Sequence, residues 1–169
     1  MHFSTIFTTL ALAATSLAAP VSEHSVAPVK RSAPKFTVKN YCKEAVYVTS
    51  VASARRPTAR VKPFVFWSEE QYYDPTTGGI SMQVTKGSSL DGIHPILNAA
   101  YTYNAGSSVY YSLSTVNDWG YDFAGTAVKY FAVNDFDNAI VWKGNVGTFE
   151  THAYLGGETE LVLELCVMD

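Results

Sequence analysis

The sequence predicts an all-β protein whose strands form an antiparallel β-sandwich. Short segments with alternating polar and apolar side chains follow one another from residue 36 to residue 167, and Gly, Pro, Asn and Asp stand at the breaks. This pattern is typical of antiparallel strands joined by turns. No amphipathic stretch of ten or more helical residues follows residue 31. The remaining length suits one domain with a single core.

The first 31 residues carry two processing signals. An apolar run ends at Leu17-Ala18-Ala19-Pro20, as in a secretory signal peptide with small residues at its cleavage point. The polar segment that follows ends in the dibasic pair Lys30-Arg31. We therefore expect a signal peptide over 1–19, a propeptide over 20–31 and a secreted domain over 32–169. No later apolar segment approaches the roughly 20 residues of a membrane span.

Composition and cysteine content narrow the function classes. The formal net charge is −3, and a mildly acidic chain argues against a nucleic-acid partner. Cys42 and Cys166 are the two cysteines of the chain, and in an oxidising compartment we expect them to pair. On the chain-entropy account this bond would stabilise the fold by about 5 kcal/mol. Two cysteines without neighbouring histidines do not make a tetrahedral metal set, so we predict no metal and no cofactor.

The N-terminal half contains four strand candidates, and the first two are rich in β-branched and aromatic residues. The first two are separated by Lys43-Glu44 and predict a hairpin. Pro63 interrupts the third and marks it as an edge strand. The loop 55–60 holds three arginines, which suit either an anionic ligand or solvent. The loop 68–79 is polar and aromatic. The four expected strands are 36–42, 45–51, 61–67 and 80–85.

The C-terminal half continues in the same way. A hairpin is expected across Ala105-Gly106-Ser107. The expected strands are 99–104, 108–113, 126–133, 139–142, 149–155 and 159–167. In the last of these, Cys166 falls on the face opposite Leu161, Leu163 and Leu165. A bulge or a position at the sheet end near Cys166 would let it meet Cys42.

The segment 109–125 is the most informative part of the chain. Val109, Tyr111 and Leu113 fall on one side of an extended strand, and Tyr110, Ser112 and Ser114 fall on the other. The alternation then stops at a loop in which aromatic rings stand beside carboxylates, a surface chemistry that suits sugar rings. The alternative is that Trp119 and Phe123 plug the open end of a sandwich core.

Three blocks of sequence resemble the fungal secreted yeast-phase-specific antigen family, also described as antigenic thaumatin-like proteins. They are Val46 to Val51 after Cys42, Tyr72 to Met82, and Tyr110 to Val116 running into Phe123-Ala124-Gly125. The resemblance implies a thaumatin-like β-sandwich, export by a fungus, and a role at the cell surface or in contact with a host.

The chain departs from that family pattern in two places. Members usually carry aspartates in a Tyr-Asp-Leu-Ser-Asp-Val block, where this chain has Ser112 and Thr115. Many also carry a further cysteine before an Ile-x-Trp strand, where Asp137-Asn138-Ala139 precedes Ile140 here. The first departure weakens an acidic-cleft glucanase function, and the second leaves one disulfide.

Three functions follow as hypotheses. The leading one is an exported, non-catalytic monomer that binds cell-wall glucan or a host surface molecule through its aromatic loops. The second is an endo-β-glucanase that uses Asp118 and Asp122, with Asp74 as a further candidate, because glycoside hydrolysis needs two nearby carboxylates. The third is an effector or antigen that binds a host protein. The candidate ligand-binding residues are Trp67, Tyr72, Tyr73, Asp74, Asp118, Trp119, Tyr121 and Asp122.

Overall fold

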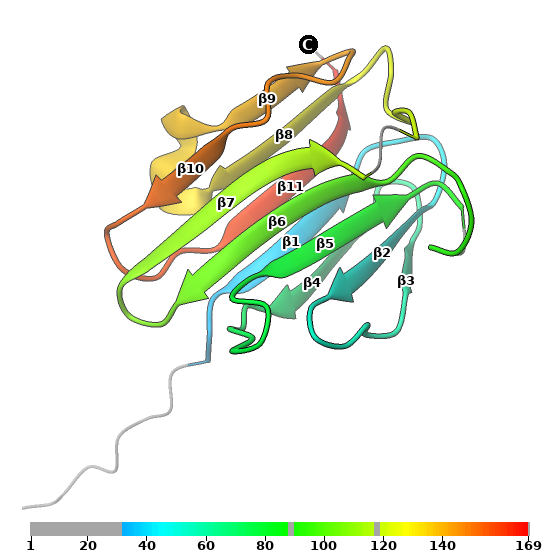
Figure 1. Ribbon diagram of the computed structural model, residues 1–169. Helices are drawn as coiled ribbons and strands as arrows, with labels where there is room; N and C mark the ends of the chain where they lie inside the picture. Colours follow the sequence, from blue (N-terminus) through cyan, green and yellow to red (C-terminus); the bar gives the residue numbers. More distant parts are fainter. Residues whose placement is uncertain (1–31, 88–89, 117–118, 169) are drawn as a thin grey trace, which may run out of the picture. The chain divides into compact units, whose positions relative to one another are not determined.

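The computed structural model describes residues 32–87, 90–116 and 119–168, and these form two β-sheets (Figure 1). The expected signal peptide, propeptide and Lys30-Arg31 pair lie outside the described residues. A short 3-10 segment, Val133–Asn138, joins β8 to β9. The strands are β1 Lys35–Asn40, β2 Val46–Val51, β3 Ala59–Val61, β4 Phe66–Glu70, β5 Ile80–Thr85, β6 Leu97–Asn104, β7 Ser108–Thr115, β8 Ala127–Ala132, β9 Ile140–Lys143, β10 Thr151–Tyr154 and β11 Leu161–Val167.

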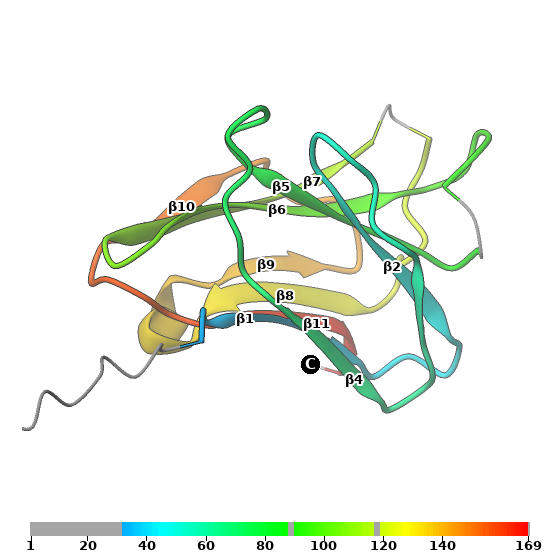
Figure 2. The same cartoon turned by 90° about the horizontal axis from the view of Figure 1, so that it is seen from below.

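The two sheets lie as layers, one over the other (Figure 2). The five-stranded sheet has the order β4-β1-β11-β8-β9, and the six-stranded sheet has the order β10-β7-β6-β5-β2-β3. Alternate residues of both sheets point into the space between them, and their apolar side chains form one core. The predicted all-β sandwich is therefore confirmed.

The predicted hairpin between the first two strands is wrong. β1 belongs to the five-stranded sheet, whereas β2 pairs with β3 and β5 in the six-stranded sheet. Tight two-residue hairpins favour Asn or Gly at positions with positive φ, and Lys43-Glu44 supplies neither. The chain instead uses residues 41–45 to cross from one sheet to the other.

The predicted strand 61–67 is divided in two at Pro63. β3 ends at Val61 on the edge of the six-stranded sheet, and β4 begins at Phe66 on the edge of the five-stranded sheet. Proline cannot donate to a sheet ladder, so the chain changes sheet where its ladder is interrupted. The edge position is confirmed, but β4 extends to Glu70, into the segment that was expected to be a loop.

The later strands agree with the sequence. β5 spans the predicted residues, and β6 and β7 form the predicted hairpin, each two residues longer at the end away from the turn. β8 to β11 lie within one or two residues of their expected bounds. Periodicity of two was a sufficient signal for β5 and β6, because their residues alternate between buried and partly exposed positions.

The first and last strands lie side by side, and their pairing is parallel rather than antiparallel. Phe36 pairs with Leu161, and Asn40 pairs with Leu165. Cys42 and Cys166 form the predicted disulfide just beyond this ladder. The register of β11 against β8 shifts between Leu165 and Val167, and Cys166 has a φ of 56°. This irregularity is the predicted bulge that turns Cys166 towards Cys42.

Four aromatic rings link the two sheets through the core. Phe36 of β1 stacks on Tyr101 of β6, with 5.8 Å between ring centroids, and Tyr130 of β8 meets Tyr111 of β7 edge-on at 5.2 Å. The Tyr130 hydroxyl donates to the carbonyl of Ala100 at 3.3 Å. Buried aromatic pairs contribute beyond their buried area, and this bonded hydroxyl avoids the cost of an unpaired polar group.

We predict that replacing both cysteines, Cys42→Ala with Cys166→Ala, lowers the free energy of unfolding by about 3 to 5 kcal/mol, because the bond closes a loop with a sequence separation of 124. Urea denaturation of the oxidised protein and of the double variant measures the difference. A loss below about 1 kcal/mol would show that the parallel β1–β11 ladder holds the chain ends without the bond.

Candidate functional site

The two aromatic loops predicted to bind a ligand lie at opposite ends of the strands. Leu97 of β6 pairs with both Val84 and Thr115, so β5 and β7, on either side of β6, end at the same end of the sheet. The loop after β7 therefore lies at the end of β5, while the loop 71–79 lies at its start (Figure 1). Asp74 cannot join Asp122 in one acidic site. Asp118 lies outside the described residues, so its pairing with Asp122 stays a prediction.

Several of the predicted ligand-binding rings are turned towards the core. Trp67, Tyr72 and Tyr121 are partly buried and pack against the buried residues of the sandwich. Phe123 is fully buried, as the alternative of a core-plugging loop requires. Trp119 is partly buried, with its ring centroid 6.5 Å from that of His94, and Tyr73 is exposed. These rings do not form one continuous binding surface.

Asp74 shapes the loop that precedes β5. Its carboxylate accepts hydrogen bonds from the Ser53 hydroxyl and from the backbone N–H groups of Thr76 and Thr77, at 2.9 and 3.0 Å for the two amides. The Ser53 hydroxyl is the main cause that lowers the Asp74 pKa to about 2, and the Thr77 and Thr76 amides act in the same direction. Asp74 thus ties this loop to the loop after β2.

Two of the three arginines in the predicted basic loop already have partners. The Arg56 guanidinium lies 3.7 Å from the centre of the Tyr72 ring and 3.4 Å from Glu69. Arg55 lies 3.2 Å from Asp91. Because these charges are engaged within the chain, the loop is less suited to an anionic ligand than the sequence alone allowed.

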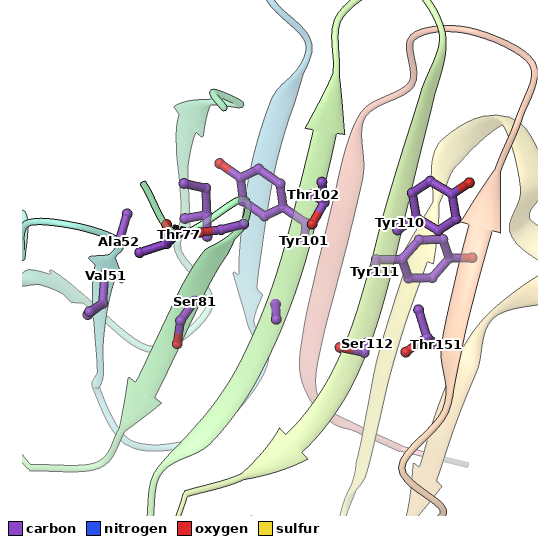
Figure 3. Close-up of a pocket in the computed structure, with 13 residues that line it drawn as sticks. Val51, Ala52, Thr77, Ser81, Tyr101, Thr102, Tyr110, Tyr111, Ser112 and Thr151 are labelled. Carbon is purple, nitrogen blue, oxygen red and sulfur yellow. Dashed lines mark hydrogen bonds between the residues drawn. The ribbon is translucent and has the colours of Figure 1, made fainter. Parts of the chain in front are cut away.

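A depression of about 460 Å³ lies on the outer face of the six-stranded sheet (Figure 3). It spans β5, β6 and β7 and reaches Thr151 of β10. Val51 at the end of β2, Ala52 and the loop 77–79 border it on one side. Thr77, which the Asp74 carboxylate holds through its amide, belongs to this border. The predicted ligand-binding residue Asp74 therefore helps to position one wall of this depression, which the sequence did not reveal.

The lining of the depression carries no acidic or basic side chain among the described residues. Its side-chain polar groups are hydroxyls, and its outward-facing aromatic ring is Tyr110, which is 43% exposed. Sugars offer many neutral hydroxyls and apolar ring faces, so a hydroxyl-rich lining with one exposed ring suits them. The outer-face lining residues drawn in Figure 3 are Ser81, Thr102, Tyr110, Ser112 and Thr151.

A row of hydrogen-bonded side chains extends the polar surface along the same face. The Ser81 hydroxyl donates to Asn98 Oδ1 at 2.7 Å, and Asn98 Nδ2 donates to Ser114 at 3.0 Å. Gln83 donates to Ser81 at 3.2 Å. These bonds hold the amides in fixed orientations, which lowers the entropy cost of binding a ligand.

Metal binding and membrane insertion of a helix find no support in the described residues. No group of three or more His, Cys, Asp or Glu side chains there converges as a metal site would require. His152 uses both ring nitrogens locally, with Asn138 at 2.8 Å and Glu150 at 3.0 Å. No helix in this part of the chain is long and apolar enough to cross a membrane.

We predict that Asp74→Asn removes an acid-dependent part of the stability. The folded-state pKa of Asp74 is lowered from 3.8 to about 2, so its charge stabilises the fold at neutral pH, and this contribution is lost as pH falls from about 4 to 2. The difference in Tm between the wild type and the variant should be largest near pH 7 and should shrink across that window. A difference that is independent of pH would show that the carboxylate charge is not responsible.

We predict that Tyr121→Phe is neutral or raises the free energy of unfolding by about 1 kcal/mol. The Tyr121 hydroxyl is buried without a hydrogen-bond partner in the described structure, and burial raises its pKa to about 12.

Tyr111→Phe is the matched control for this change, because that hydroxyl donates to the carbonyl of Asn138 at 2.9 Å. Its loss should lower stability by about 1 kcal/mol in the same denaturation experiment. Equal destabilisation of both variants would contradict the difference between the two hydroxyls.

Comparison with known proteins places this architecture in a family. A search of curated proteins gave no match. Among solved structures, the chain is similar to the crystal structure of the protein elicitor MoHrip2 from Magnaporthe oryzae, with a TM-score of 0.61 and 20% identity over 80% of this chain and 100% of that one. At this identity the likeness shows a shared fold. Residues 24–167 match Bys1, described as Blastomyces yeast-phase-specific protein. The chain therefore belongs to this yeast-phase-specific fungal family, as the resemblance of its sequence blocks had indicated.

Proposed function

We propose that this protein is a secreted, non-catalytic fungal protein that binds a neutral polysaccharide, of the cell-wall glucan class, on the outer face of its six-stranded sheet. The family and the disulfide fit an extracellular location. The observation that carries the proposal is the depression whose polar side chains are all hydroxyls and whose exposed ring is Tyr110.

The absence of charge in this lining argues for a neutral ligand and against hydrolysis. A glycosidase needs one carboxyl group to protonate the leaving oxygen and a second to act as base or nucleophile. No carboxylate lines the depression within the part of the chain that is described. Asp74, which the sequence suggested as a catalytic carboxylate, already accepts hydrogen bonds from Ser53, Thr76 and Thr77.

The arrangement across the strands supports an extended ligand. Tyr110 on β7 pairs with Thr102 on β6, and both lie beside the depression. The bonded row Ser81, Asn98 and Ser114 crosses the same three strands further along the sheet. A polysaccharide could place one sugar ring on Tyr110 and direct the hydroxyls of the next towards the amide and hydroxyl groups.

An elicitor-like role in contact with a host is the second candidate function. The observation that favours it is the fold shared with MoHrip2, a protein elicitor. In that role the partner would be a host protein. Co-precipitation from host extract, compared with retention on polysaccharide, separates the two functions.

We predict that Tyr110→Ala weakens retention on insoluble β-glucan about tenfold, the equivalent of about 1.4 kcal/mol. The ring is largely outward-facing, so the variant should keep the wild-type Tm. The matched variant is Trp119→Ala, at the opposite end of the strands, which should bind as the wild type does. Chitin serves as the comparison polysaccharide.

Two outcomes would overturn this assignment. If Trp119→Ala loses binding and Tyr110→Ala keeps it, the ligand binds at the aromatic loop after β7. If neither β-glucan nor chitin retains the wild-type protein, polysaccharide binding is wrong and the host-protein role becomes the leading hypothesis.

A further inference from the structure

The turn between β3 and β4 displays a phenylalanine in an unfavourable backbone conformation. Phe64 has a φ of 59° and is 67% exposed. The left-handed region is costly for a bulky residue, and glycine or asparagine would normally occupy it. An exposed ring at such a position gains little burial to offset that cost, so the side chain itself is a candidate for function.

The buried side chain of Asn40 holds this turn in place. Asn40 is fully buried, and its Nδ2 lies within 3.1 Å of the carbonyls of Val61 and Lys62. Its backbone carbonyl accepts from the Phe64 amide at 2.7 Å, and its amide donates to the Val65 carbonyl at 3.3 Å. The turn is therefore fixed from beneath, and the Phe64 ring is presented on a rigid support.

Three consecutive apolar residues form the tip of this turn. Phe64, Val65 and Phe66 are 67%, 45% and 54% exposed. The ring of Tyr41 packs edge-on against Phe66, with 5.8 Å between centroids. We call these four residues the Phe64 tip. Contiguous exposed apolar residues on a protein surface mark sites of interaction.

Three lysines lie in the segments that adjoin the Phe64 tip, although the protein as a whole is acidic, with a net charge of −3. Lys62 belongs to the turn and is exposed, and Lys43 is exposed in the adjoining segment, whose Glu44 carbonyl accepts from Asn40. Lys39 lies 5.7 Å from the centre of the Phe66 ring and pairs with Glu164. The Glu44 carboxylate lies 3.5 Å from Lys86.

We propose that the Phe64 tip docks on the surface of an anionic phospholipid bilayer, with Phe64 and Phe66 inserted at the headgroup level and Lys62 and Lys43 facing the phosphates. Aromatic and aliphatic side chains with adjacent lysines are the combination that binds anionic membrane surfaces. The exposed Lys62 and Lys43 are the observation that favours an anionic bilayer over an apolar protein surface, because lipid phosphates attract basic side chains. This proposal does not depend on the depression on the outer face of the six-stranded sheet.

The test is co-sedimentation of the full secreted protein with vesicles of phosphatidylcholine containing phosphatidylserine, and with vesicles of phosphatidylcholine alone. The wild type should bind the anionic vesicles, and added salt should weaken that binding. Phe64→Gly should weaken it about tenfold, because it removes the inserted ring. Glycine adopts positive φ without strain, so this variant should keep or raise the wild-type Tm.

Two further variants keep the result interpretable. Phe66→Ser changes an exposed position of β4 and leaves the turn unaltered, so it should also weaken binding if Phe64→Gly disturbs the fold. Leu155→Ala removes a side chain of matching exposure, 69%, from the loop before β11 and should bind as the wild type does.

Failure of the wild type to bind anionic vesicles overturns the proposal. Equal weakening by Leu155→Ala does so as well, because the effect would then not belong to the tip. A dimer in sedimentation velocity that Phe64→Gly dissociates would assign the tip to a second copy of the chain and also overturn lipid docking.

Discussion

The structure depends on the hydrogen bonds of one buried amide, that of Asn40. The chain crosses between the sheets twice near its start, first over residues 41–45 and then at Pro63, and each crossing interrupts a β-ladder. Asn40 bonds to both crossings: its Nδ2 donates at the Glu44, Val61 and Lys62 carbonyls, and its Oδ1 accepts from the Cys42 amide. Backbone groups that leave a ladder inside a protein must find other partners, and Asn40 supplies them.

The same constraint positions the disulfide and the exposed tip. Oδ1 of Asn40 accepts from the Cys42 amide and so orients the chain just after β1. Cys42 therefore lies next to Cys166, which the bulge in β11 turns towards it. Because the Asn40 backbone bonds to Phe64 and Val65, the second crossing is a tight turn instead of a loose loop. A polar side chain in the core thus helps to position both the buried disulfide and the exposed turn.

Strand positions could be predicted from the sequence, but the sheet to which each strand belongs could not. Periodicity of two depends on local burial, and β5 and the β6–β7 hairpin follow it closely. Sheet membership depends on which sheet the chain joins after a ladder is interrupted. Pro63 indicates an interruption, but neither it nor Lys43-Glu44 indicates the sheet to which the next strand belongs. Asn40 did carry a signal, since it shares the inward face with Phe36 and Val38, and a polar residue there requires partners. The sequence predicted that Tyr110 and Ser112 lie on one face of β7. That Ser81 and Asn98 lie on the same face of the sheet could not be predicted, because it depends on the register of three strands.

The two proposed binding surfaces lie on different parts of one rigid sandwich. The depression lies towards the start of β5 on the outer face of the six-stranded sheet, whereas the Phe64 tip follows β3 beside the end of β1. Tyr47 of β2 pairs with both Arg60 and Thr85, which puts β3 level with the end of β5, on the other side of β2, and away from the depression. Ligands at the two surfaces would therefore not compete for space. If both proposals hold, one molecule binds a polysaccharide on its six-stranded sheet and a lipid surface at its Phe64 tip at the same time.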